Sequence, residues 1–338
     1  MPVQARSIRG AAIAPLPDGE YMRRTAPPPL VPISLDGALA PIWCKLEFLH
    51  PSGSTKDRIA AHILAKAWRE GLLSPGARVI EASSGSTSIA LAMVCAQMGL
   101  RFTAVMPASV SNERILMIKA YGAQVELSPA GEGMCGALRR AKELAECLQA
   151  FRPRQFENPD NVAAHRFGTA REILSQIPNG SVDAVVSGVG TGGTLVGLFA
   201  GMLDQGCKVT PVAARPVMAA TPRAGAPTSA RGAFGEVECC SFSSRIPGVV
   251  ENLTALYRPQ EMPGLVEIDV DDELALQTTR ALIGKGFPVG PSSGLNLAAA
   301  LEFQRRCDRP AAIVTVFPDR MERYFSTELF APVRPRAE

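Results

Sequence analysis

The sequence predicts an α/β protein with parallel sheets, and three observations lead to this class. Its 338 residues are enough for two domains, or for one large α/β unit with an added lobe. Hydrophobic residues make up 46% and charged residues 20%, as expected for a globular protein with a sizeable core. From residue 78 onward, short apolar runs alternate with longer segments of helical pattern. Strands that alternate with helices at this spacing are typical of parallel βαβ units.

Two series of strands and helices are predicted. The first has strands at 78–82, 102–106 and 124–127 and helices at 87–98, 112–121 and 135–148. The second has strands at 183–187, 208–213 and 311–317 and helices at 194–202, 272–285 and 294–306. Residues 155–162, with prolines nearby, interrupt the alternation and are expected to connect two lobes.

We therefore divide the chain into three parts. Residues 1–40 begin with a Pro- and Arg-rich stretch and predict an arm that packs on the large domain or on a partner subunit. Residues 41–152 form a smaller α/β domain, and residues 153–330 form a larger one. In the larger domain, residues 215–235 are rich in Ala, Pro, Thr and Gly, which predicts a long loop of the kind often found in lids and interfaces.

The composition argues against several classes of function. The formal net charge is only +3, which is too small to indicate binding to nucleic acid or to an anionic membrane. None of the eight cysteines forms a CxxC pair and the three histidines are far apart, so the spacing of a metal site is absent. No apolar run resembles a signal peptide or approaches transmembrane length. We expect a cytoplasmic protein that acts on small molecules.

Lys56 is the first candidate catalytic residue. It follows the small residues Gly53, Ser54 and Thr55, which close an extended segment at 42–48, and it precedes a predicted helix at 59–68. At such a junction a lysine can present its amine to a pocket, where desolvation lowers its pKa as a Schiff-base lysine requires. Taken alone, the motif fits an ordinary solvated lysine equally well.

Two loops, each between a predicted strand and a predicted helix, favour a reactive Lys56 in a pocket over a solvated lysine. Residues 187–194 (SGVGTGGT) allow the backbone to approach an anion closely, and their spacing fits a monophosphate better than a dinucleotide or a P-loop. Residues 81–88 (EASSGSTS) bring hydroxyl groups and free amides to a helix start, which suits the carboxylate of an amino acid. Helix capping alone would explain one or two of these serines.

A third loop, at residues 289–294 (VGPSSG), contains Ser292, which could bind a ring nitrogen. A reactive lysine, a phosphate loop and a carboxylate-binding loop together indicate pyridoxal 5'-phosphate (PLP) and an amino-acid substrate.

At this point the sequence resembles the cysteine synthase and cystathionine β-synthase family of fold-type II PLP enzymes. The similarity extends from about residue 28 to residue 327. The motifs that carry it are residues 53–58 (GSTKDR), 83–87 (SSGST), 155–159 (QFENP), 190–194 (GTGGT) and 319–327 (DRMERYFST). The resemblance implies a fold like that of the tryptophan synthase β subunit: two open, twisted α/β domains with the cofactor between them. The smaller domain would be mobile, and the protein would be a homodimer.

The resemblance also implies a role for each motif. Lys56 would form the Schiff base with PLP, and Ser292 would bind the pyridine nitrogen without holding it protonated. Gln155 would contact the substrate carboxylate, and Ser86 would also lie against the ring hydroxyl of the cofactor. The phosphate would be bound by Gly190, Thr191, Gly192, Gly193 and Thr194, and the substrate carboxylate by Ser83, Ser84, Gly85, Ser86 and Thr87.

The implied reaction is β-replacement on an activated L-serine, either O-acetylserine or O-phosphoserine. Lys56 would remove the Cα proton, a role that needs a pKa near the working pH. Loss of the leaving group would give an aminoacrylate, to which sulfide adds to form cysteine. Closure of the smaller domain would exclude water.

Two departures from the family pattern bear on the substrate. Ser86 replaces the asparagine that is usual in cysteine synthases, and Val250 replaces a glycine in the later wall of the site at 245–250. These segments look more like a branch that includes PLP-dependent cysteine desulfhydrases. Three alternatives therefore stay open: desulfhydration of cysteine, a synthase that uses another nucleophile to make a β-substituted alanine, and a non-catalytic PLP-binding protein.

Overall fold

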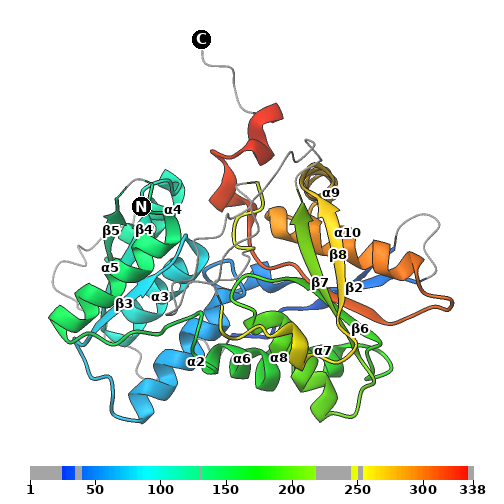
Figure 1. Cartoon of the computed structure of the whole chain (residues 1–338), viewed down its shortest axis with the longest axis horizontal. Helices are drawn as coiled ribbons and strands as arrows, with labels where there is room; N and C mark the ends of the chain where they lie inside the picture. The colour runs from blue at the N-terminus through cyan, green and yellow to red at the C-terminus, as the bar shows by residue number, and fades with distance from the viewer. Residues whose placement is uncertain (1–24, 35–39, 130, 218–244, 250–253, 334–338) are drawn as a thin grey trace, which may run out of the picture.

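The computed structural model describes residues 25–34, 40–129, 131–217, 245–249 and 254–333. These residues form two sheets of unequal size with helices packed against them (Figure 1). The smaller sheet has the strand order β3-β4-β5, and the larger one the order β1-β2-β9-β6-β7-β8. The α/β class predicted from the sequence is confirmed.

The smaller sheet consists of three parallel strands. They are β3 (Arg78–Ala82), β4 (Arg101–Pro107) and β5 (Gln124–Ser128). The helices between and after them are α3 (Ser86–Met98), α4 (Asn112–Ala120) and α5 (Gly133–Leu148). Ten residues of α3 are buried, because this helix packs both on the sheet and against α2 (Lys56–Arg69). A helix covered on several sides is apolar nearly all round.

The larger sheet is parallel except at one edge, where β1 (Leu30–Ile33) runs antiparallel to β2 (Ile42–Lys45). The remaining strands are β9 (Ile313–Val316), β6 (Ala184–Gly188), β7 (Thr210–Val217) and β8 (Val266–Asp271). Successive strand residues face opposite sides. Val186 and Val212 therefore belong to the core beneath α9 (Asp272–Gly284) and α10 (Pro291–Arg305), while Val185 packs with the core of α7 (Ala170–Gln176) and α8 (Gly193–Asp204).

A helical run precedes β6 and contains a π-helical turn. It consists of α6 (Asp160–Ala164), the π-turn His165–Thr169 and α7. This run crosses α8 at close range, since a Cβ atom on Gly197 would overlap His165 and one on Gly201 would overlap Ala170. The close crossing places His165 beside the start of α8.

Most of the predicted strands and helices are present within a few residues of their expected bounds. Three elements were not predicted: β1, β8 and the helical run at 160–176. Residues 42–45 fall within the predicted smaller domain and form a strand of the larger sheet. The reason is that Ile42 and Cys44 are fully buried in the core of that sheet.

Other predictions lie partly or wholly outside the described residues. Of the predicted loop at 215–235, residues 215–217 end β7 and the rest are outside. Most of the predicted arm at 1–40 is also outside, as is Val250. The division into two domains stays a prediction.

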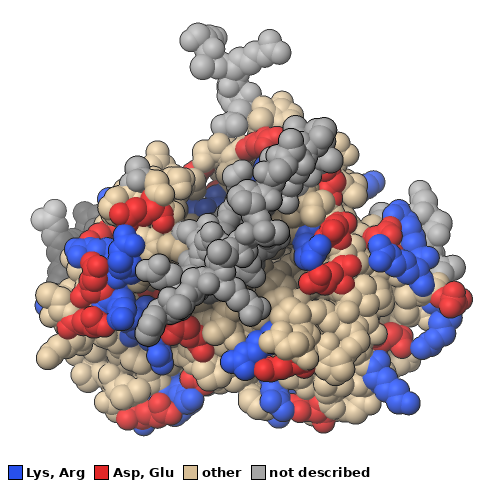
Figure 2. All heavy atoms as spheres, viewed as in Figure 1, with Lys and Arg blue, Asp and Glu red and all other residues tan. Residues whose placement is uncertain are grey.

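The surface carries charges of both signs, which alternate over the face shown in Figure 2. Within the described residues, none of the helices combines the length and apolar character needed to cross a bilayer.

Candidate active site

The candidate site is a pocket at the carboxyl ends of β3, β6 and β9, where ligands bind in open α/β sheets. Its walls include eleven of the thirteen predicted site residues. They are Lys56, Ser83, Ser84, Ser86, Thr87, Gln155, Gly190, Thr191, Gly192, Thr194 and Ser292. The other two, Gly85 and Gly193, lie in the same loops. The structure thus brings together segments that are far apart in the sequence.

Lys56 is the first residue of α2 and lines the pocket. Burial lowers the pKa of its amine, and the carboxylates of Asp319 and Glu47 oppose part of this effect. The backbone before it is fixed, because Thr55 N donates to Pro318 O at 2.8 Å, just after β9. A lowered pKa increases the share of the free amine, the form in which a lysine acts as a nucleophile or a base.

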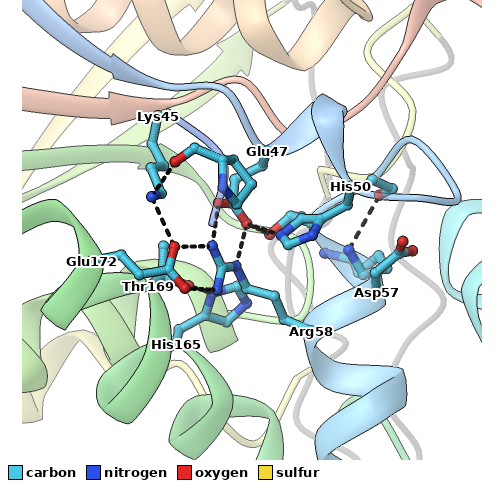
Figure 3. A network of polar contacts seen from close by, with 12 residues as sticks. Lys45, Glu47, His50, Asp57, Arg58, His165, Thr169 and Glu172 are labelled. Atoms are coloured by element: carbon cyan, nitrogen blue, oxygen red, sulfur yellow. Dashed lines mark hydrogen bonds and ion pairs between the residues drawn. The ribbon is translucent and has the colours of Figure 1, made fainter. Parts of the chain in front are cut away.

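A buried ion network fixes the helix turn that carries Lys56 (Figure 3). Arg58, two residues further along α2, donates to Glu47 through Nε and Nη2 at 2.6 and 2.8 Å. The same guanidinium donates to Glu172 on α7 through Nη1 and Nη2 at 2.7 and 2.6 Å. Thr55 also donates to Glu47, at 3.0 Å. Glu47 therefore contacts Thr55, directly before Lys56, and Arg58, two residues after it.

The charges of this network compensate one another. Burial disfavours the ionised form of Glu47, but Arg58 and His50 outweigh it, so the pKa of Glu47 lies well below its usual range. Lys45, fully buried on β2, donates to Glu172 at 2.8 Å and to Gln176 at 2.9 Å. Buried charges are tolerated when they are paired in this manner.

In the hydroxyl-rich loop after β3, some side chains hold the start of α3 and others bond to Gln155. The Ser83 hydroxyl accepts from Gly85 N at 3.0 Å and Ser88 N at 3.3 Å, so it caps the start of α3. Thr87 instead donates to Gln155 Oε1 at 2.6 Å. Gln155 Nε2 in turn donates to the carbonyl oxygen of Ala82 at 2.8 Å. The two predicted carboxylate contacts, Thr87 and Gln155, therefore form one unit.

Glu81 holds the backbone of the Thr87–Gln155 pair in place. It is fully buried, and its carboxylate accepts from Ala82 N at 2.9 Å and Gln155 N at 3.2 Å. Burial raises the pKa of Glu81 to about 7, and these N–H groups oppose part of the rise.

The glycine-rich loop after β6 is tightly constrained. Gly192 has a φ of +81°, in the left-handed region that favours glycine. A Cβ atom on Gly190 would overlap the carbonyl oxygen of Gly248, and one on Gly193 would overlap the Asn161 side chain. The loop opens α8, whose first N–H groups have no partner within the helix. Such a cradle suits an anion.

Three residues that were not predicted hold this loop in place. Asn161 donates to Thr191 Oγ1 at 2.9 Å, and Thr254 donates to the carbonyl oxygen of Thr191 at 2.5 Å. His165 lies between two hydroxyls, with Nε2 3.3 Å from Thr194 Oγ1 and Nδ1 3.0 Å from Thr169 Oγ1. Burial lowers the pKa of His165 to about 3, so its ring is neutral.

Ser292 lies in the first turn of α10 and lines the pocket. One turn later, Asn296 donates to Val316 O at 2.8 Å and accepts from Gly188 N at 2.7 Å. This amide ties α10 to β9 and β6 and so fixes Ser292 opposite the glycine-rich loop. Asn296 was not predicted, since a lone asparagine in a helix carries no recognisable signal.

Asp319, Tyr324 and Arg114 also line the pocket. Asp319 and Tyr324 lie in the motif at residues 319–327, and neither was predicted to be a site residue. In the part of the chain that the structure describes, no three His, Cys, Asp or Glu side chains lie close enough to hold a metal ion.

Comparison with known families matches residues 23–319 to the family described as pyridoxal-phosphate dependent enzymes. This match covers most of the chain. The chain belongs to this family. Its cofactor is therefore pyridoxal 5'-phosphate, as the three loops predict.

Individual relatives of this PLP enzyme support the assignment. A cysteine synthase from Staphylococcus aureus is 36% identical over 299 residues, which cover 88% of this chain and 91% of the relative. The solved structure of an O-ureido-L-serine synthase is 33% identical, with a TM-score of 0.77, and covers 92% of this chain and 94% of its own. A hydrogen sulfide-producing enzyme from Fusobacterium nucleatum is 29% identical, with a TM-score of 0.80, and covers 95% and 93% of the two chains.

The residues present fit this cofactor. The glycine-rich loop lies at a helix start, as a phosphate group requires, and packs so closely on Gly248 and Asn161 that added Cβ atoms would displace it. Lys56, whose amine has a lowered pKa, lines the same pocket and could bind the aldehyde carbon. Ser292 is a neutral hydroxyl that could bind the ring nitrogen. The individual roles of these residues stay predictions.

Proposed function

We propose that this PLP enzyme replaces the β-substituent of an activated L-serine, O-acetylserine or O-phosphoserine, with sulfide to give L-cysteine. The observation that carries the proposal is the convergence of three groups on one pocket: the Lys56 amine, the Thr87–Gln155 pair and the glycine-rich loop. Each suits a different part of the bound reactants.

The residues of the chain divide the work as follows. The backbone N–H groups of the hydroxyl-rich loop and the Gln155 amide bind the substrate carboxylate and so orient Cα toward Lys56. The bound cofactor supplies the electron sink that makes the Cα proton acidic. The Lys56 amine takes this proton, and the leaving group departs from Cβ with the electrons of its bond. Sulfide then forms a bond to Cβ, and Lys56 returns the proton to Cα.

The environment of Lys56 favours this role. An ordinary lysine is protonated at neutral pH and cannot accept a proton. Burial lowers the pKa of Lys56, while Asp319 and Glu47 keep it from falling further. A base whose pKa lies near the working pH is the most effective one.

Two other reactions of the same kind are supported by the relatives. The similarity to the hydrogen sulfide-producing enzyme favours release of sulfide from cysteine. The similarity to O-ureido-L-serine synthase favours addition of a nucleophile other than sulfide. Ser86, which replaces the usual asparagine, is compatible with either.

One assay separates cysteine synthesis from desulfhydration. Purified enzyme is incubated with O-acetylserine and sulfide, with O-phosphoserine and sulfide, and with cysteine alone. Formation of cysteine in either of the first two supports the proposal, and the more efficient donor identifies the activated serine. Release of sulfide and pyruvate from cysteine alone, without cysteine synthesis, would replace it with desulfhydration. Inactivity in all three, with an unchanged cofactor spectrum, would favour a binding protein.

We further propose that the enzyme acts as a homodimer in the cytoplasm. Both statements come from the sequence and its family resemblance. Light scattering on the purified protein tests the first, since a single-chain mass at micromolar concentration would contradict it. Fractionation of the source cells tests the second.

A further inference from the structure

Asp319 occupies the side of the pocket that lies next to Lys56. It follows β9, and its backbone forms an antiparallel bridge with Ser54, two residues before Lys56. Its side chain is only 6% exposed and lines the pocket. A carboxylate in this position has a direct influence on the groups around it, because the surroundings are desolvated.

One oxygen of this carboxylate receives two hydroxyl donors. Asp319 Oδ2 accepts from the Tyr324 hydroxyl at 2.7 Å and from the Ser86 hydroxyl at 3.0 Å. Burial raises the pKa of Tyr324, so its hydroxyl keeps its proton and remains a donor. Tyr324 itself is held by Arg114, whose guanidinium carbon lies 5.2 Å from the ring centre. Oδ1 has no hydrogen-bond partner among the described residues.

The consequence concerns Ser86. A serine hydroxyl has one proton and two lone pairs. With its proton committed to Asp319, the Ser86 oxygen can offer only lone pairs to the pocket. We propose that Asp319 is a positioning residue that makes Ser86 a hydrogen-bond acceptor, so that the reactant group placed against Ser86 must carry an O–H or N–H. This inference rests on the proposed function, which puts the cofactor and the amino acid in this pocket.

Two reactant groups have the required chemistry. One is the ring hydroxyl of the cofactor in its protonated form, and the other is the ammonium group of the amino acid. An asparagine side chain in place of Ser86 could present an N–H donor instead. Ser86 together with Asp319 therefore presents an acceptor to the reactants at the point where an asparagine could present a donor.

The geometry supplies a matched pair of variants. Because both hydroxyls contact the same oxygen, Asp319→Asn can keep both hydrogen bonds through its amide oxygen while losing the charge. Asp319→Ala removes the acceptor and frees the Ser86 proton to point into the pocket. Each is made with Ser86 intact and in the Ser86→Ala background, which gives a double-mutant cycle. Thermal unfolding shows whether each variant folds. If Asp319→Ala does not fold, Ser86→Ala alone tests the loss of the Ser86 oxygen as an acceptor.

Two readouts distinguish the two reactant groups. The first is the ratio of visible to near-ultraviolet absorbance of the bound cofactor without substrate. If the ring hydroxyl is the donor, Asp319→Ala raises this ratio about tenfold, the effect of one hydrogen bond. The second is the apparent Kd for the amino acid from spectral titration. If the ammonium group is the donor, the Kd rises about tenfold and the substrate-free spectrum stays the same. In either case Asp319→Asn changes the readout less than twofold, roughly within the error of such a comparison.

Three results would overturn the inference while leaving the proposed function intact. These are equal effects of Asp319→Asn and Asp319→Ala, an effect of Asp319→Ala that is undiminished in the Ser86→Ala background, or no change in either readout. The first would mean that the charge of Asp319, and not its hydrogen bond to Ser86, sets the readout. A visible cofactor band that persists in Lys56→Ala would instead overturn the proposed site, and this inference with it.

Discussion

The Thr87 hydroxyl donates a 2.6 Å hydrogen bond to the side-chain oxygen of Gln155, which lies 68 positions further along the chain. Each residue alone is an ordinary polar side chain. Together, with Gln155 anchored to the carbonyl oxygen of Ala82, they form a rigid polar wall at the carboxyl end of β3. This wall is where we expect the substrate carboxylate to bind.

Thr87→Val removes the hydroxyl with little change in volume and frees Gln155 from its partner. We expect the KM for the amino acid to rise about tenfold with a smaller change in kcat, as for the loss of a hydrogen bond that orients a charged group. Steady-state kinetics measure both. Thr87→Ser keeps the hydroxyl and is the control. An equal effect of Ser and Val would assign the loss to packing.

Lys56→Ala should abolish the visible absorbance of the bound cofactor and lower the turnover by at least about a hundredfold, since the proposed base is lost. Absorption spectra and single-turnover assays test this. Lys66→Ala is the control on the same helix, because Lys66 is half-exposed and pairs with Asp160 away from the pocket lining. A variant at position 56 with an intact spectrum would show that another residue holds the cofactor.

Glu47→Ala leaves Arg58 buried with only Glu172 as a partner. Removing one member of a buried ion pair costs about 3–5 kcal/mol, and we expect the lower end because Glu172 remains. Urea unfolding of the cofactor-free protein measures the loss. Asp204→Ala removes an exposed partner of Arg166 and should have a much smaller effect. Similar losses for the two variants would mean that the buried network contributes no special stability.

His165 predicts a dependence of stability on pH. Its pKa is about 3 in the folded protein, against an ordinary value of 6.5. Below pH 6.5 the unfolded chain takes up a proton that the folded chain does not, so the folded state loses stability as the pH falls toward 3. The slope is at most about 1.4 kcal/mol per pH unit. The difference in unfolding free energy between wild type and His165→Gln isolates this effect, and a difference independent of pH would contradict it.

Gly193→Ala places a methyl group where the Asn161 side chain lies. Because the phosphate cradle must shift to make room, we expect PLP affinity to fall at least about tenfold. Fluorescence titration of the cofactor-free protein measures this. Gly284→Ala, at the end of α9 with no neighbour within 4 Å of the added atom, is the matched control and should bind PLP normally. Unchanged affinity in Gly193→Ala would place the phosphate elsewhere.

The sequence allowed the alternating strands and helices to be predicted because buried parallel strands are short apolar runs. The three loops could be recognised because glycines and hydroxyls gather there in excess of what a turn or a helix cap needs. β8 was missed although Ile268 and Val270 alternate with acidic residues, a period-two signal typical of a half-exposed strand. The π-turn at His165–Thr169 has no such signal.

The supporting residues of the site could not be predicted. Asn161, Thr254 and His165 contact the phosphate loop only after the chain has folded, and each is a common polar residue in an unremarkable context. Asp319 was visible as part of a motif, but its contact with Ser86 joins positions 233 residues apart. Local pattern carries no information about such pairs.

The place of β2 in the larger sheet has a consequence for motion within the enzyme. The segment before Lys56 is tied by backbone hydrogen bonds to the residues after β9, from Thr55 N to Pro318 O and from Arg320 N to Gly53 O. The hydroxyl-rich loop, in contrast, extends from the smaller sheet. If the two sheets shift relative to each other, the backbone just before Lys56 stays with the residues after β9, while the rest of α2 is packed on α3 and the hydroxyl-rich loop moves with the smaller sheet. A ligand that contacts both the hydroxyl-rich loop and the phosphate loop would therefore resist such a shift.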